Sequence, residues 1–193
     1  MNRVDPSGLT CTATTGTHIC TTDTYNRRPV QRDKNGAPRI YTKTARNRSV
    51  RDSKAEAKVS RLDASMTKSY GTIKSNPDAK YSQALNGEGY PESGLKLEFT
   101  GAELAKIAED TEVNAETVNT PKESNVGGDT NAAGHVNLYV DRLRTDAIRQ
   151  DAATHEWIHN TPIAADFVRI KGVEGFPEHQ KFFDNLVKQV LGN

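Results

Sequence analysis

Residues 155–159 read His155-Glu156-Trp157-Ile158-His159, and this short stretch decides how the rest of the chain is interpreted. The two histidines are one helical turn apart, so both imidazoles would leave the same face of a helix. That spacing lets two ring nitrogens reach one zinc ion at about 2.0–2.1 Å. Glu156 is then placed to take a proton from a water molecule that attacks a carbonyl group. The stretch predicts a zinc site with His155 and His159 as ligands and Glu156 as the base; a surface helix that happens to carry these residues is the alternative.

The residues on either side predict the elements that carry this site. Upstream, apolar residues at Val136, Leu138 and Val140 alternate with polar ones, which is the period of a strand with one face in water. His135 and Tyr139 are expected on that wet face, as surface residues. A helix from about Thr145 to Asn160 would follow. Downstream, Thr161-Pro162 is typical of a helix start. After Pro177, a last helix is expected to bury Phe182, Phe183, Leu186, Val187, Val190 and Leu191.

A catalytic zinc ion needs a third protein ligand in addition to the two histidines. The downstream candidates are Asp166, Glu174, Glu178, His179 and Asp184. On a helical wheel, His179 lies near the middle of the apolar face of the last helix, where an imidazole without a partner would be costly. We therefore predict His179 as the third ligand. Glu178, on the flank of that face, remains the alternative, and so does a structural His179 bonded to backbone.

The remaining chain is less strongly patterned. Residues 10–24 are rich in threonine, which favours extended chain, and residues 26–50 are a polar, basic loop with a turn at Asn35-Gly36. A polar helix is expected over 51–69 and a strand over 95–99. Thr100 and Glu103 have the spacing of a capping box for a helix from about Gly101. Residues 119–134 are expected to be a loop.

Charge is balanced over the whole chain, with a net charge of +1, but it is unevenly distributed. Residues 26–61 hold twelve Lys and Arg against three acids, and residues 85–135 hold ten acids against three lysines. The basic segment has only Tyr41 as a stacking aromatic, so we expect it to lie against the acidic half of its own domain rather than on nucleic acid. Cys11 and Cys20 fit either a disulfide or two thiols. No apolar run reaches the roughly 18 residues of a membrane helix.

Two resemblances add to these expectations. Residues 1–9, with the wording Asp5-Pro6-Ser7-Gly8-Leu9, resemble the end of the Rhs (YD-repeat) core that precedes a variable toxin domain. That resemblance implies cleavage after Leu9 and release of a toxin that starts at Thr10. It also implies delivery into a rival bacterial cell, with type VI secretion as the expected route, and a cognate immunity protein.

Residues 135–193 resemble zincin metallopeptidases through the HExxH residues quoted above. The resemblance implies a Zn²⁺ cofactor, His155 and His159 as ligands and Glu156 as general base. The segment from His179 to Phe183 is similar to the third-ligand segment of SprT-like peptidases. It departs from that segment in its longer distance from the motif and in lacking Gly-Pro. The third histidine of the long metzincin motif is absent.

Together these observations predict an α+β fold, a zincin-like metallopeptidase with a small sheet beside the HExxH helix and a C-terminal helix. Residues 1–9 would be the end of the Rhs core, 10–65 a polar, basic arm and 66–193 the catalytic domain. The predicted function is a secreted antibacterial toxin that hydrolyses peptide bonds in the cytoplasm or periplasm of the target cell. Its expected partners are a protein or peptide substrate, the immunity protein and the Rhs core of the precursor. The alternatives are a nucleic-acid-targeting toxin that uses residues 26–61 and an inactive zincin-like binding module.

Overall fold

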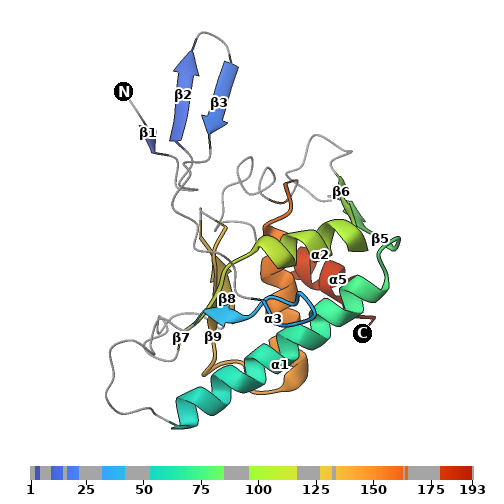
Figure 1. Ribbon diagram of the computed structural model, residues 1–193. Coiled ribbons are helices and arrows are strands. Elements are labelled where there is room, and N and C mark those ends of the chain that lie inside the picture. Colours follow the sequence, from blue (N-terminus) through green and yellow to red (C-terminus); the bar gives the residue numbers. More distant parts are fainter. Residues whose placement is uncertain are drawn as a thin grey trace.

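The structure is a computed structural model that describes residues 3–4, 10–14, 17–21, 32–41, 53–84, 96–116, 127–131, 134–162, 164 and 179–192. At residues 3–4, 10–14, 17–21, 41, 53–55 and 179–181 it describes the backbone alone. The chain is mixed α+β, as predicted (Figure 1). Its described helices are α1 (Ser53–Ser75), α2 (Gly101–Asp110), α3 (Asp146–His159) and α5 (His179–Leu191).

The described strands form three separate sheets. The first has the order β1-β2-β3, built from Arg3–Val4, Thr10–Thr14 and Thr17–Thr21. The second has the order β4-β7-β9-β8, built from Ile40–Tyr41, Val113–Glu116, Val136–Tyr139 and Gly128–Thr130. In it, β4, β7 and β9 are parallel and β8 is an antiparallel outer strand. The third pairs β5 (Lys80–Ala84) with β6 (Lys96–Thr100).

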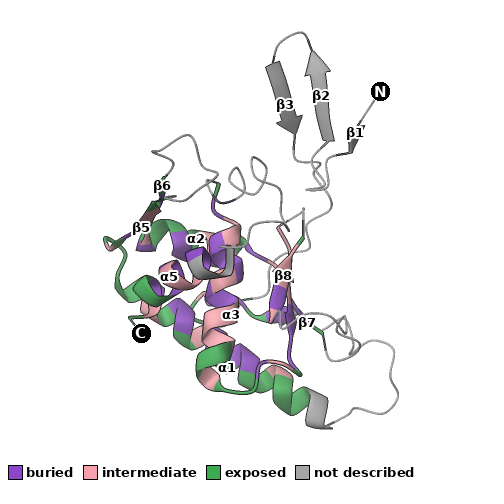
Figure 2. Ribbon diagram, turned by 180° about the vertical axis from the view of Figure 1, so that it is seen from behind, coloured by how far each residue is buried: buried purple, intermediate pink, exposed green. Residues whose placement is uncertain are grey.

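The core lies where α3 meets α1, α5 and the four-stranded sheet (Figure 1). Trp157 and Ile158 of α3 are fully buried there, together with Leu62 and Met66 of α1 and Phe183 of α5. In Figure 2 the buried surface follows the sides of the helices that face one another, while the outer side of α1 is exposed. Helix α3, which carries the histidine pair, is therefore held between other elements over most of its length.

Local sequence signals set the helix starts as predicted. Thr100 caps α2: its side chain accepts a hydrogen bond from the backbone N–H of Glu103. The carboxylate of Glu103 accepts one from the backbone N–H of Thr100, which completes the capping box. Thr145 caps α3, its hydroxyl accepting from the backbone N–H of Ile148 at 3.2 Å. Thr161 likewise accepts from the backbone N–H of Ala164 at 3.3 Å. The rest of the helix expected after Thr161-Pro162 lies outside the described residues.

Helix α5 is attached to the sheet of β5 and β6 by an amide group. Gln189 of α5 accepts from the backbone N–H of Ser82 and donates to its carbonyl, both at 3.1 Å. The side chain thus pairs with the backbone of β5 as a neighbouring strand would. These two bonds hold the C-terminal part of α5 against β5.

The structure corrects three expectations. The boundary expected at residue 65 falls inside α1, and Leu62, Ala37 and Ile40 are all buried, so residues 32–40 and the whole of α1 belong to the packed unit. Strand β8 lies within 119–134, where a loop was expected. Tyr139 is 8% exposed and not on a wet face, and its hydroxyl donates to Asp129 of the neighbouring strand β8.

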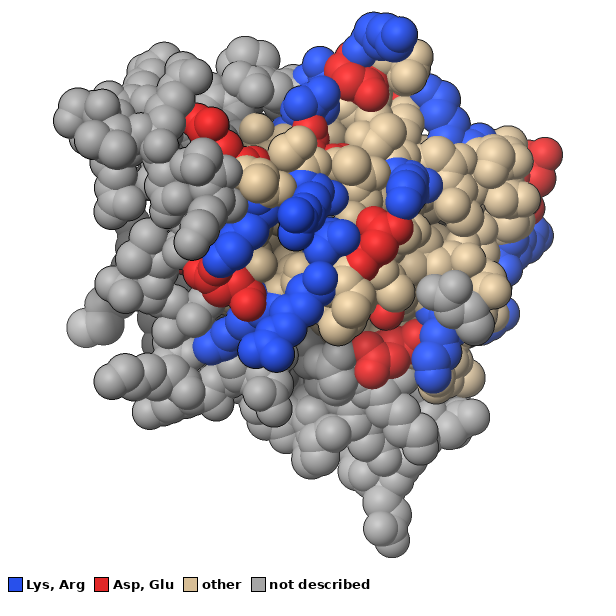
Figure 3. Space-filling model, turned by 90° about the horizontal axis from the view of Figure 1, so that it is seen from below, with Lys and Arg blue, Asp and Glu red and all other residues tan. Residues whose placement is uncertain are grey.

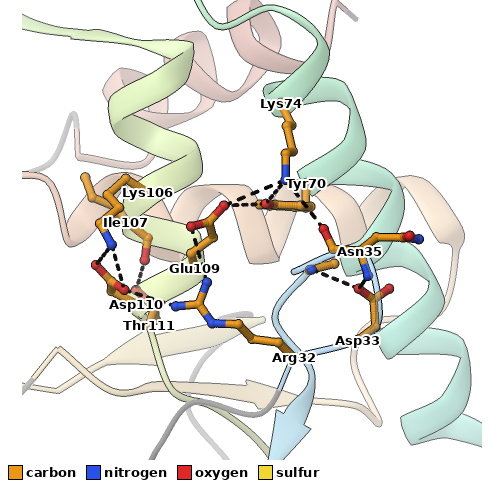
Figure 4. A network of polar contacts seen from close by, with 11 residues as sticks. Arg32, Asp33, Asn35, Tyr70, Lys74, Lys106, Ile107, Glu109, Asp110 and Thr111 are labelled. Atoms are coloured by element: carbon orange, nitrogen blue, oxygen red, sulfur yellow. Dashed lines mark hydrogen bonds and ion pairs between the residues drawn. The ribbon is translucent and has the colours of Figure 1, made fainter.

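Acidic residues elsewhere in the domain pair with the described part of the basic segment. Arg32 bonds to both Glu109 and Asp110 of α2 (Figure 4). Arg39 pairs with Asp63. Lys58 pairs with Asp141. Figure 3 shows the same mixture of basic and acidic side chains on the underside of the molecule. The contacts of Arg32 are with the acidic residues 85–135, as expected, whereas Asp63 and Asp141 lie outside that range; residues 26–31 and 42–52 of the basic segment lie outside the described residues. Among the described helices, none is long and apolar enough to cross a membrane.

Candidate metal centre

His155 and His159 come together on α3 as their spacing predicts. Their Nε2 atoms lie 3.1 Å apart, and both residues are half-buried. Two nitrogen ligands of one tetrahedral zinc ion, each about 2.0–2.1 Å from the metal, lie about 3.3 to 3.4 Å from one another. The observed separation is therefore close to what a shared ion requires, and the donor set of two imidazole nitrogens suits zinc.

Helix α5 presents an aromatic ring to this histidine pair. The ring of Phe183 stacks on that of His159, with centroids 4.0 Å apart, and lies 5.1 Å from that of His155. Phe183 is fully buried, so the contact restricts both imidazoles on the side of α5. His179 is one helical turn before Phe183, on the same face of α5. The backbone of α5 thus brings position 179 to the face that meets the histidine pair.

Glu156, between the two histidines, is 5% exposed. Its Oε2 accepts a hydrogen bond from the hydroxyl of Thr130 on β8 at 2.7 Å. Burial raises the pKa of the Glu156 carboxyl to about 7, with Thr130 acting to lower it and the charge of Asp129 to raise it. A carboxyl group that titrates near neutrality can both accept and release a proton, which is what general acid–base chemistry requires.

Strand β8 begins with a glycine, Gly128, that is closely surrounded by β9 and α3. A Cβ atom at Gly128 would stand 2.7 Å from a methyl group of Leu138, 2.8 Å from the carbonyl oxygen of Asn137 and 3.3 Å from Cγ of Glu156. A Cβ atom at Gly127 would stand 3.4 Å from that of Ala152. No larger residue fits at Gly128 without moving its neighbours. The absence of a side chain is what lets Thr130 reach Glu156.

The other face of the sheet holds Asp129 in place. Asn137 donates to Asp129 Oδ1 at 2.8 Å, and the hydroxyl of Tyr139 donates to Oδ2. Burial, followed by the hydrogen bond to Asp129, raises the pKa of Tyr139 well above its ordinary value. Tyr139 therefore keeps its proton and fixes a negative charge near the carboxylate of Glu156.

The structure tests the predicted site residues unevenly. It brings together His155, Glu156 and His159, but the side chain of His179 and all of Glu178, Asp166 and Glu174 lie outside the described residues. Asp151 lies on α3, one turn before His155. Burial raises the pKa of Asp151, and the negative charge of Asp184 on α5 raises it further. Within the described part of the chain, no three His, Cys, Asp or Glu residues are arranged to hold a metal ion.

The sequence did not reveal the contribution of strand β8. Thr130 and Asp129 lie in a stretch that has the composition of a loop, and neither is part of a motif. The paired glycines at 127 and 128 were the available signal, because glycine in a strand often marks a close approach of two backbones.

Comparison with known proteins identifies no relative: the chain matches no protein-family model, no curated protein and no solved structure.

Proposed function

We propose that this protein is a zinc-dependent metallopeptidase with a zincin-like catalytic domain. The observation that carries the proposal is the arrangement on α3: the Nε2 atoms of His155 and His159 lie 3.1 Å apart, and Glu156, next to His155 in the sequence, is buried with a pKa of about 7. Zinc held there would lower the pKa of a water molecule to about 7 and polarise a carbonyl group. His155 and His159 would hold the ion, and Glu156 would accept the proton of the attacking water.

The position of strand β8 favours an extended peptide as the substrate. In the described four-stranded sheet β8 is the outermost strand, paired on one side with β9. An outer strand offers backbone N–H and C=O groups to which an extended chain can add. Such a chain would run past Thr130 and hence past Glu156, which Thr130 contacts. A peptide bond would thus be brought to the base.

Zinc content and proteolysis, measured on the same preparations, test this function. The wild-type protein should bind one zinc ion per chain and cleave an unfolded protein such as casein. His155→Ala and His159→Ala should lose both zinc and cleavage. His135→Ala, in the turn before β9, is the matched control and should keep both. A wild-type protein that binds no zinc, or that binds zinc without cleaving any peptide, would contradict the proposal.

We propose His179 as the third ligand, supported by its place one turn before Phe183 on α5. His179→Ala should then lose zinc and activity together. Glu178→Ala should retain both, with a small change in stability, because a carboxylate before a helix interacts favourably with the helix N-terminus. Zinc lost in Glu178→Ala and kept in His179→Ala would instead assign the ligand to Glu178.

We also propose that this peptidase is a toxin released from an Rhs precursor. The support is the sequence wording at residues 1–9, which lies largely outside the described residues. The precursor should be cut between Leu9 and Thr10, by the core and not by the peptidase, so that cleavage persists in Glu156→Gln. N-terminal sequencing of the released fragment decides this, and a different first residue would contradict it. A cognate immunity protein should suppress the toxicity of the fragment.

The alternative of a nucleic-acid-targeting toxin has less support. Arg32, Arg39 and Lys58 belong to the basic segment, and each forms an ion pair with an acid of its own domain. Cations that are already paired release fewer counterions from nucleic acid, so they contribute less to its binding. An inactive zincin-like module is distinguished by the cleavage assay itself, since it would bind zinc and leave the peptide intact.

A further inference from the structure

We propose that Thr130 is a positioning residue for Glu156: its hydroxyl holds one carboxylate oxygen and so directs the other toward the substrate. The inference rests on the proposed peptidase function, because it assigns a role within the same site. It concerns a residue that lies outside the HExxH stretch and on a different element, β8.

The contact has the geometry of a strong hydrogen bond. Thr130 Oγ1 lies 2.7 Å from Glu156 Oε2 and 3.3 Å from the backbone carbonyl oxygen of the same residue. A hydroxyl group has one hydrogen to donate, and the shorter contact is the one with the charged acceptor. Thr130 thus donates its hydrogen bond to Oε2 of the Glu156 carboxylate. Oε1 is left to act on water.

No other described residue holds the Glu156 carboxylate by a hydrogen bond. Within the described part of the chain, Thr130 is the single group that hydrogen-bonds to the Glu156 carboxylate. A glutamate side chain has three torsions, so it needs a partner to hold one orientation. Burial raises the importance of that partner, because a buried carboxylate without one has no water to replace it.

A second carboxylate on the same strand is held elsewhere. Asp129 precedes Thr130 and accepts hydrogen bonds from Asn137 and from the hydroxyl of Tyr139, both on β9. Thr130 is the residue of β8 whose side chain bonds to the Glu156 carboxylate.

The strand that carries Thr130 is fixed on α3 at a second point. Asn160, at the end of α3, donates to the carbonyl oxygen of Gly134, in the turn between β8 and β9, at 2.9 Å. The same amide group lies 3.2 Å from the hydroxyl of Thr111. The close approach at Gly128 holds the other end of β8. Thr130 lies between these two anchors, so its own position is well determined.

Three variants test the inference. Thr130→Val removes the hydroxyl at nearly constant shape, and Thr130→Ser keeps it. Thr154→Val is the matched control, because Thr154 is a buried threonine of α3 whose hydroxyl has no hydrogen-bond partner among the residues that the structure describes. Each variant is assayed for kcat and KM on the peptide substrate, for zinc content and for thermal unfolding.

We expect Thr130→Val to lower kcat by about 10- to 100-fold, the range associated with loss of a hydrogen bond to a charged group, with KM and zinc content unchanged. Thr130→Ser should restore kcat to within about threefold of the wild type. Thr154→Val should match the wild type. A residue with a merely structural role would lower Tm, zinc content and kcat together. That pattern, or a wild-type kcat in Thr130→Val, would overturn the inference.

A crystal structure of Thr130→Val gives a readout that does not depend on activity. The Glu156 carboxylate should leave the position that it occupies in the wild type, where Oε2 faces residue 130. An unmoved carboxylate would overturn the inference, even if the protein turned out to have no peptidase activity. Absence of activity from the wild-type protein would instead overturn the proposed function, so the two failures are distinguishable.

Discussion

Glu156 of α3 and Glu109 of α2 both accept a hydrogen bond from a hydroxyl group, yet their pKa values shift in opposite directions. Glu109 accepts from Tyr70, and that bond, with further help from Arg32, lowers its pKa (Figure 4). Glu156 accepts from Thr130, but burial outweighs the bond and raises its pKa to about 7. Both carboxylates accept from a hydroxyl group, one phenolic and one aliphatic, and their surroundings also differ.

The surroundings differ in charge and in access to water. Arg32 lies 3.2 Å from the Glu109 carboxylate and Lys74 lies 4.0 Å from it, and the side chain keeps 24% of its exposure. Glu156 is 5% exposed, and the charge of Asp129 acts on it unfavourably. The first arrangement stabilises the charged form and with it the fold. The second destabilises the charged form, which suits a group that must exchange a proton during a reaction.

Replacing Glu156 tests this contrast with the largest expected effect. Glu156→Gln should reduce proteolysis by at least about 100-fold while zinc remains bound, because the base is lost and no ligand is. Glu109→Gln is the matched control and should retain the activity of the wild type. Loss of zinc from Glu156→Gln would show that Glu156 is a ligand, and retained proteolysis would refute its role as base.

Glu156→Gln should also reveal how the raised pKa of Glu156 makes the stability of the protein depend on pH. A folded-state pKa raised above the unfolded one contributes stability that is lost as pH rises through about 7. Metal-free wild-type protein should therefore lose stability between about pH 5 and pH 8 relative to metal-free Glu156→Gln, by an amount on the order of 2 kcal/mol. Denaturant unfolding at the two pH values measures it. If the difference in unfolding free energy between wild type and Glu156→Gln stayed constant with pH, the pKa of Glu156 would not be raised in the folded protein.

Filling the space at Gly128, where β8 meets β9, should be destabilising by a comparable amount. Gly128→Ala places a Cβ atom within 3 Å of both Leu138 and Asn137, at a cost of about 1–3 kcal/mol. Gly71→Ala in α1 is the control, since nothing lies within 4 Å of the added atom and alanine favours a helix. Gly128→Ala should lower Tm and Gly71→Ala should raise it. Equal effects would show that the close approach at β8 is not tightly packed.

The smallest effect is expected at Glu109. Its pKa is lowered, so its contribution is present above the unfolded value of 4.5 and is lost as pH falls through the folded value. Glu109→Gln should be less stable than the wild type by about 1 kcal/mol at pH 7. The difference should disappear at low pH, where the wild-type carboxyl is also protonated. Chemical unfolding at pH 7 and pH 3 measures it, and a difference that persists at pH 3 would show that packing, not charge, is responsible.

The contrast between the two glutamates could not be read from the sequence. The HExxH stretch identified Glu156, because its neighbours in sequence are its neighbours on the helix. The sequence also indicated the basic and acidic segments that meet at Arg32 and Glu109. It did not indicate Tyr70 or Thr130 as the partners, because the residues of each pair are far apart along the chain.

Features that depend on a few adjacent residues were thus determined by the sequence alone. These are the α+β class, the span of α3, the caps at Thr100 and Thr145, the apolar face of α5 and the approach of His155 to His159. Each follows from helical periodicity or from a side chain that bonds to backbone nearby. Tertiary structure decided the rest, namely the three-residue strand β8, the burial of Tyr139 and the bond from Thr130 to Glu156. A short glycine-containing strand has little preference of its own, so it forms only where β9 and α3 provide its partners.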